Sequence, residues 1–233
     1  MMLPVAILAG GLATRLGDVG RTTPKSLVDV AGQPFIAHQI DLLREHDLTD
    51  IVLCTGHLSS QVEDVVGDGS RYGVRVRYSH DGPNPLGTGG ALRHALPLLG
   101  KAFLALYGDS YLACDYRAVG HAFMTSGRQA LLTVFRNQDR WDRSNVLCLD
   151  GRIVQYSKTH RTPGMRHIDY GLAAMRAEAL LAYPENEALD LARVYEDLVA
   201  QGALAAYEVS TRFYEIGTPS GLDDTRQHLG RVE

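Results

Sequence analysis

The sequence predicts an α/β fold of three layers, in which helices cover both faces of a mostly parallel, mixed sheet. Short apolar runs typical of strands alternate with segments of helical spacing through residues 1–137, and glycine-rich or acidic loops follow several of these runs. Alternation of this kind favours parallel strands joined by crossover helices. Ligands bind such sheets at the carboxyl ends of the strands. We expect the 233 residues to form one domain with two parts, 1–137 and 138–233.

Each element of the first part has a local signal. Ile36, Ile40 and Leu43 recur at helical spacing after Pro34, which suits a first helical position. Ser59 is expected to cap the following helix. The expected strands span residues 5–8, 51–55, 74–78, 103–107 and 130–135, and the expected helices span 35–46, 59–66, 89–96 and 116–125.

The second part is richer in short strands. Asp150-Gly151 between two apolar runs is typical of a type I′ hairpin turn. We expect this part to form a small β-rich lid over the same sheet, followed by a closing helix. Its expected strands span 146–149, 153–156, 168–175, 204–209 and 213–216, and its expected helices span 188–200 and 219–229.

Composition excludes several classes of partner. The net charge is −4, from 23 basic and 27 acidic residues without a Lys/Arg run, so no nucleic-acid partner is expected. No stretch approaches the roughly 20 apolar residues of a membrane span, and the first residues lack the basic region of a signal peptide. Cys54, Cys114 and Cys148 lack metal-ligand spacing. They are expected to be reduced thiols, which favours a cytoplasmic location. The sequence leaves open whether the protein forms a homodimer.

The run LAGGLATRL at residues 8–16, followed by Pro24-Lys25, is the strongest motif. Glycines in a turn after a first strand allow backbone N–H groups to approach phosphates closely. Arg15 can bind a pair of phosphate oxygens, and Lys25 can neutralise charge as a point cation. The run is neither a dinucleotide fingerprint nor a P-loop. This segment therefore predicts phosphate binding beside the first strand.

Together with PKSLVDVAGQPFI at residues 24–36, this run resembles the nucleotide-sugar pyrophosphorylases, which are sugar-1-phosphate nucleotidyltransferases. The resemblance implies a Rossmann-like nucleotide-diphospho-sugar transferase fold, with a nucleotide-binding part at 1–137 and a sugar-binding part at 138–233. Ala13 departs from the usual glycine of the family. The resemblance assigns the leaving phosphates to Arg15 and the α-phosphate to Lys25. The implied nucleotide-binding residues of this region are Leu8, Ala9, Gly10, Gly11, Thr14, Arg15 and Lys25.

Two later segments extend the resemblance. The run PLGTGGA at residues 85–91 is a loop that opens a helix, whose amides could meet a base or a phosphate. The resemblance places Leu86, Gly87 and Thr88 at the nucleobase. Gly108-Asp109 is placed like the family's Gly-Asp, which implies that Gly108 contacts the nucleotide and that the Asp109 carboxylate binds a metal ion. The implied catalytic residues are Arg15, Lys25 and Asp109.

The expected metal cofactor is Mg²⁺, which prefers hard oxygen ligands and few protein carboxylates. A second carboxylate should then accompany Asp109. The segment FYEIGTP at residues 213–219 resembles the family's Asp-x-Gly-Thr-Pro, with Glu215 in the position of the Asp. The resemblance therefore implies that Asp109 and Glu215 are the metal ligands.

The sugar phosphate is assigned to four residues of the second part: Asn145, Lys158, Asp169 and Gly171. Lys158 is placed like the lysine of the family's Glu-Lys pair, although Ser157 replaces the Glu. Asp169 and Gly171 occupy the place of the family's Asn-x-Gly, and Asp can only accept hydrogen bonds where Asn also donates. The residues that read the sugar hydroxyls therefore differ from the usual family pattern.

The expected reaction transfers a nucleoside monophosphate from a nucleoside triphosphate to a sugar 1-phosphate and releases pyrophosphate. The start of the chain and the run PLGTGGALRHAL resemble the D-glycero-D-manno-heptose 1-phosphate guanylyltransferases, which implies GTP and a heptose 1-phosphate. The mannose-1-phosphate guanylyltransferases and the N-acetylmuramate or hexose 1-phosphate uridylyl- and cytidylyltransferases stay open. So do a regulatory homologue without turnover and a glycosyltransferase, although the latter's Asp-x-Asp motif is missing at 108–110.

Overall fold

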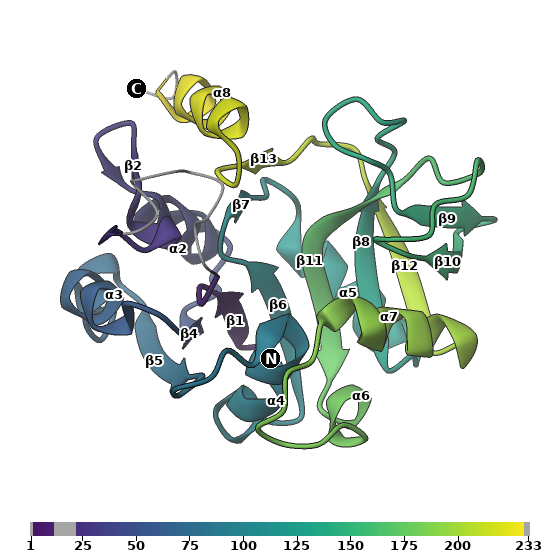
Figure 1. Cartoon of the computed structure of the whole chain (residues 1–233), viewed down its shortest axis with the longest axis horizontal. Coiled ribbons are helices and arrows are strands. Elements are labelled where there is room, and N and C mark those ends of the chain that lie inside the picture. Colours follow the sequence, from purple (N-terminus) through teal and green to yellow (C-terminus); the bar gives the residue numbers. More distant parts are fainter. Residues whose placement is uncertain (1, 12–21, 231–233) are drawn as a thin grey trace.

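A seven-stranded sheet forms the centre of the computed structural model, which describes residues 2–11 and 22–230 (Figure 1). The strand order is β12-β8-β11-β6-β1-β4-β5. Only β11 runs antiparallel to its neighbours, so the predicted mostly parallel, mixed sheet is confirmed. The strands are β1 (Val5–Leu8), β4 (Asp50–Thr55), β5 (Arg75–His80), β6 (Ala102–Tyr107), β8 (Ala130–Phe135), β11 (Ile168–Arg176) and β12 (Leu204–Val209).

Helices cover both faces of the sheet, and alternate strand residues point into two separate cores. Val5 and Ile7 of β1 pack in one core with α2, α3 and α5, whereas Ala6 packs in the other with α4, α6 and α7. This alternation is the period-two pattern of a strand buried on both faces. The helices are α2 (Phe35–Glu45), α3 (Ser59–Val66), α4 (Gly87–Leu99), α5 (Tyr116–Ser126), α6 (Glu178–Leu181), α7 (Leu191–Ala200) and α8 (Pro219–Leu229).

Three short two-stranded sheets and two 3₁₀ helices complete the described part of the chain. Asp150 and Gly151 both have positive φ, 49° and 72°, as a type I′ turn requires, so the predicted hairpin is confirmed. The β13–β7 ladder places Glu215 opposite Ser110. These elements are β2 (Asp29–Val30) with β3 (Gln33–Pro34), β7 (Ser110–Tyr111) with β13 (Tyr214–Glu215), β9 (Val146–Leu149) with β10 (Arg152–Tyr156), and the 3₁₀ helices Lys25–Leu27 and Ser70–Tyr72.

The structure differs from the sequence-based expectation at three places. Residues 138–233 do more than form a lid, because β11 lies inside the main sheet and β12 forms its edge, leaving the β9–β10 hairpin outside it. The predicted Ser59 cap is wrong, since the capping position is held by Leu58 in a left-handed conformation without a side-chain cap. The helix expected from residue 188 begins at Leu191, because the Asp190 carboxylate accepts the Ala192 N–H and caps it there.

No helix in the described residues is long and apolar enough to span a membrane. The three cysteines are free, with Cys54 buried and the other two half-buried. The predicted reduced thiols therefore agree with the structure.

Candidate functional site

A pocket of about 520 Å³ lies at the carboxyl ends of β1, β4, β5 and β6. This is the sheet edge at which the sequence predicted ligand binding. Leu86 is buried at the start of α4 and does not line the pocket. Thr14 and Arg15 lie outside the described residues. The predicted nucleotide-site residues that line the pocket are Leu8, Ala9, Gly10, Gly11, Lys25, Gly87, Thr88, Gly108 and Asp109.

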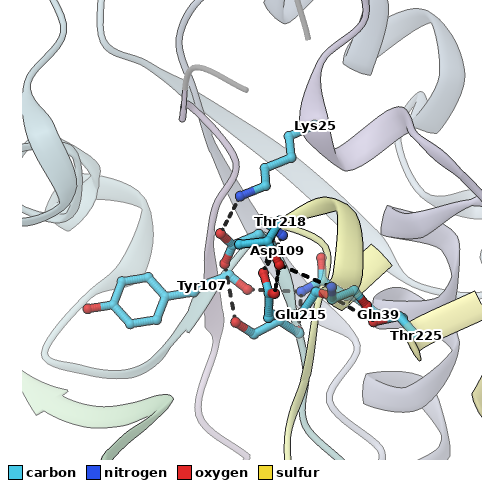
Figure 2. Close-up of polar contacts among 10 residues, drawn as sticks. Lys25, Gln39, Tyr107, Asp109, Glu215, Thr218 and Thr225 are labelled. Carbon is cyan, nitrogen blue, oxygen red and sulfur yellow. Dashed lines mark hydrogen bonds and ion pairs between the residues drawn. The ribbon is translucent and has the colours of Figure 1, made fainter. Parts of the chain in front are cut away.

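Lys25 and Asp109 form an ion pair at one end of this pocket, with 2.6 Å between Nζ and Oδ2 (Figure 2). Lys25 opens a 3₁₀ helix directly after Pro24, and Asp109 follows β6. Their side chains are 18% and 38% exposed, so the pair is partly shielded while the carboxylate still reaches the pocket. The structure thus brings together two predicted catalytic residues that are 84 positions apart.

Gln39 of α2 holds the loop that carries Asp109. Its buried side-chain Nε2 donates to the Tyr107 and Ser110 carbonyls, at 3.0 and 2.9 Å (Figure 2). Sequence reasoning missed this residue. The available signal was a polar side chain on the apolar face of an amphipathic helix, since buried polar groups are usually hydrogen-bonded.

Gly108 allows β6 to end directly against β1. Its N–H donates to the Leu8 carbonyl at 3.1 Å. A Cβ at this position would lie 2.5 Å from the same oxygen, which is inside van der Waals contact. The glycine of the predicted Gly-Asp motif is therefore required by this close backbone approach.

Glu215 turns its carboxylate into the start of α8. Its oxygens accept hydrogen bonds from the Gly217 N–H, from the Thr218 N–H at 3.2 Å and from the Thr218 hydroxyl at 2.6 Å. Thr218 caps the helix by accepting the Gly221 N–H, and the Thr225 hydroxyl donates to the Glu215 carbonyl (Figure 2). These bonds fix the carboxylate in one orientation.

Gly217 links Glu215 to the Lys25–Asp109 pair. A Cβ built on Gly217 would lie 2.7 Å from Glu215 Oε2, 2.8 Å from Lys25 Nζ and 3.5 Å from Asp109 Oδ2. The three charged groups therefore surround one point at the pocket wall. Within residues 2–11 and 22–230, no cluster of three or more His, Cys, Asp or Glu side chains could hold a metal ion. Any metal bound here would need ligands beyond these two carboxylates.

The predicted sugar-side residues form a second group, which does not line the pocket but adjoins it through Tyr107. A Cβ on Gly171 would lie 3.3 Å from the Tyr107 ring, so the glycine backbone runs close to it. Asp169 accepts hydrogen bonds from the Tyr156 hydroxyl at 3.1 Å and the Gly171 N–H at 2.9 Å. Burial raises the pKa of Asp169, although the Gly171 N–H and the Lys158 ammonium oppose that rise. The Asn145 side chain accepts the Asp169 N–H, so it positions this segment.

Lys158 lies over the Tyr107 ring, with Nζ 6.0 Å from the centroid, and pairs with Asp190 at 3.2 Å. The same Asp190 oxygen accepts from the Thr88 hydroxyl at 3.3 Å. Burial alone would raise the pKa of Asp190, but the Ala192 N–H and Lys158 lower it overall. Sequence reasoning missed Asp190, which connects the predicted base loop to the predicted sugar-phosphate lysine.

Asp81 is a second carboxylate of the pocket that sequence reasoning missed. It directly follows β5, and its Oδ2 accepts the Leu86 N–H at 3.1 Å. Burial raises the pKa of this carboxyl group, opposed by the Leu86 N–H and by His94. A lone Asp after a strand carries no sequence signal that separates a site residue from an ordinary turn residue.

Two curated proteins illustrate the sequence similarity. The chain is 42% identical over 121 residues to the N-acetylmuramate alpha-1-phosphate uridylyltransferase of Neisseria meningitidis serogroup B. The aligned region covers 52% of this chain and 51% of that protein. It is 24% identical over 223 residues to the UTP–glucose-1-phosphate uridylyltransferase of Synechocystis, which covers 89% and 58%. The matches thus span less than two thirds of the length of these relatives.

The fold is shared with solved structures. The crystal structure of HddC from Yersinia pseudotuberculosis superposes with a TM-score of 0.81 at 23% identity, covering 98% of this chain and all of that one. The family model described as nucleotidyl transferase matches residues 5–144, which include the β1 glycines, Lys25, the start of α4 and Asp109. With the pocket these residues form, the match shows that the chain belongs to the nucleotidyl transferase family.

Proposed function

We propose that this protein transfers a nucleoside monophosphate from a nucleoside triphosphate to a sugar 1-phosphate and releases pyrophosphate. The observation that carries the proposal is the partly shielded Lys25–Asp109 pair at the end of a pocket with a glycine-rich wall. Such a pocket suits a nucleotide, with backbone amides and one cation for its phosphates. The curated relatives with sugar-1-phosphate uridylyltransferase names agree with this class of reaction.

The chemistry requires placement and charge stabilisation rather than a general base. An oxygen of the sugar phosphate, already anionic at neutral pH, attacks the α-phosphorus. The new O–P bond forms as the bond to the bridging oxygen breaks, and pyrophosphate leaves with that electron pair. Lys25 stabilises negative charge on the α-phosphate, and Arg15 is proposed to hold the leaving phosphates. Lys158 holds the attacking phosphate. To do so, its ammonium leaves Asp190 and pairs with the phosphate instead. The exposed Lys158–Asp190 pair costs at most about 1 kcal/mol to break.

The residues of the site fit a magnesium ion. Asp109 and Glu215 supply two carboxylates beside Gly217, and Mg²⁺ is usually held by one or two carboxylates together with substrate phosphates. When bound, the ion would supply positive charge to the α-phosphate. Lys25 occupies Asp109 Oδ2 in the structure, so its ammonium would shift toward the phosphate in the loaded site.

For the substrates, we propose GTP and D-glycero-D-manno-heptose 1-phosphate, used in the cytoplasm to make a nucleotide sugar for polysaccharide synthesis. The support is the similarity of the first motif and of residues 85–96 to the heptose 1-phosphate guanylyltransferases. Ser157 and Asp169, which depart from the usual family pattern, are the residues through which the sugar choice would differ.

A panel of nucleoside triphosphates against sugar 1-phosphates, with Mg²⁺ and a pyrophosphate assay, tests this proposal. Lys25→Ala and Asp109→Ala should each lower kcat by at least about 100-fold. The first removes the cation that stabilises the transferred phosphate, and the second removes a carboxylate proposed to hold the magnesium ion. Lys101→Ala, which removes an exposed cation outside the pocket, serves as the matched control. Unchanged turnover in either site variant, with an unchanged melting temperature, would contradict the assigned roles.

A further inference from the structure

The pocket has two chemically different ends. Asp109, Gly10, Gly56 and Asp81 follow β6, β1, β4 and β5, which are adjacent in that order in the sheet. Three strand spacings of about 4.8 Å therefore separate the Asp109 end from the Asp81 end by about 14 Å. Of the described residues that line the pocket, Lys25 is the only Lys or Arg, and it lies at the Asp109 end. Phosphates belong at that end.

The opposite end is apolar except for one carboxylate. Cys54 and Pro85 line it with little polarity, and Leu8 and Ala9 lie between the two ends, next to Gly108. Such a lining suits a planar base. Asp81 Oδ2 would lie 3.6 Å from a Cβ on Gly56, so the carboxylate sits against the end of β4. One of its oxygens already accepts the Leu86 N–H, which fixes its orientation.

We propose that Asp81 is the residue that selects guanine, an inference that rests on the proposed function of the pocket. A carboxylate only accepts hydrogen bonds. Guanine is the base that presents two adjacent donors, the N1–H and the N2 amino group, on one edge. These two donors match the two oxygens of one carboxylate, in the same bidentate way that a guanidinium does.

Other bases pair less well with this group. Uracil and thymine present one N3–H between two carbonyl oxygens, and both oxygens face the negative charge. Cytosine and adenine each present an amino group next to a ring nitrogen that is an acceptor. Each therefore places at least one acceptor against Asp81, which opposes its binding.

Calorimetric titration of the full chain with GTP, UTP and inosine triphosphate tests Asp81 independently of turnover. Inosine triphosphate keeps the N1–H of GTP and lacks the 2-amino group. The wild-type protein should bind GTP about 5- to 150-fold more tightly than UTP, as expected for one bidentate pair, with inosine triphosphate between them. Equal affinities of the wild-type protein for GTP and inosine triphosphate would overturn the bidentate contact, and this comparison needs no variant.

Asp81→Asn is the decisive variant, because its amide oxygen can still accept the Leu86 N–H while its NH₂ opposes the guanine donors. It should lose the GTP preference and gain affinity for UTP, whose carbonyls accept that NH₂. Asp64→Asn makes the same chemical change on an exposed residue of α3 and should alter neither affinity. Unchanged GTP preference in folded Asp81→Asn would overturn the role of Asp81.

The two proposals fail in different ways. Selective GTP binding without pyrophosphate release, with every sugar 1-phosphate, would overturn the proposed reaction and leave Asp81 as the guanine reader. Turnover with UTP as efficient as with GTP would overturn the role of Asp81 and leave the reaction standing. No binding of any triphosphate would overturn both.

Discussion

Three charged side chains converge at one glycine, which has no side chain to keep them apart. Lys25, Asp109 and Glu215 come from three distant segments and meet around the point that a Cβ on Gly217 would occupy. The two carboxylates are held differently, since Asp109 pairs with the Lys25 ammonium alone at its Oδ2 and Glu215 is fixed by backbone and Thr218 donors. An ion pair that a phosphate can displace, next to a rigid carboxylate, suits a site that must exchange substrates.

Gln39→Leu tests how far the Asp109 loop depends on a residue outside the pocket. The change removes two hydrogen bonds to the Tyr107 and Ser110 carbonyls and replaces the buried amide with an apolar side chain of similar size. We expect a loss of about 1–3 kcal/mol in the free energy of unfolding, measured by urea titration. We also expect kcat to fall more than the KM for triphosphate rises, because the loop positions a group of the reacting centre.

Gln201→Leu is the control for this variant, since Gln201 is exposed after α7. It should change stability by less than about 0.5 kcal/mol. A Gln39→Leu protein with wild-type kcat would show that the loop is held without Gln39.

At the scale of elements, the site depends on how closely β1 and β6 end together. The Gly108 N–H bonds to the Leu8 carbonyl, and no Cβ fits between them. The pocket wall at Leu8 to Gly11 and the Asp109 carboxylate are therefore positioned by the same contact.

Two glycine variants separate this close approach from a general effect of adding a methyl group. Gly108→Ala should destabilise the protein by about 1–3 kcal/mol, because the methyl group overlaps backbone that cannot move freely. Gly120→Ala, inside α5 with nothing within 4 Å of the added Cβ, should stabilise it by about 0.5–1 kcal/mol. Urea titrations measure both, and a stable Gly108→Ala protein would contradict the reported geometry.

At the scale of the whole molecule, the two cores bury many groups that can lose a proton at high pH. Burial raises the pKa of Cys54 and Cys114 to about 12 and that of Cys148 to about 11. It also raises the pKa of the Tyr107 and Tyr116 hydroxyls well above the usual value. In the unfolded chain these groups ionise near their ordinary values, about 8.5 for Cys and about 10 for Tyr.

These shifts predict that the protein loses stability in alkaline solution. Between about pH 8.5 and 12 the folded state binds more protons than the unfolded state, so the free energy of unfolding falls as pH rises. The urea midpoint should be lower at pH 10.5 than at pH 8, with reducing agent in both samples. An equal or higher midpoint at pH 10.5 would contradict burial of these groups.

Most of the element order was predictable, because strands and helices here follow local apolar patterns and turn residues. The glycine turn after β1, the Asp150-Gly151 hairpin and the Gly108-Asp109 loop all carry local signals. Gln39, Asp81 and Asp190 were not predictable as site residues. Their roles arise from contacts between segments, such as the bonds from Gln39 to Tyr107 and Ser110, which no local pattern encodes.

The position of β11 has a consequence for synthesis of the protein. This strand joins β6 to β8, yet its residues follow those of both strands in the chain by more than 30 positions. A nascent chain that has emerged only to residue 144 holds the strands around the pocket, but its β8 lacks the neighbour that links it to them. The strands β1, β4, β5 and β6 can therefore pair on the ribosome before the sheet closes, while the edge of β8 that faces β11 stays unpaired until β11 emerges.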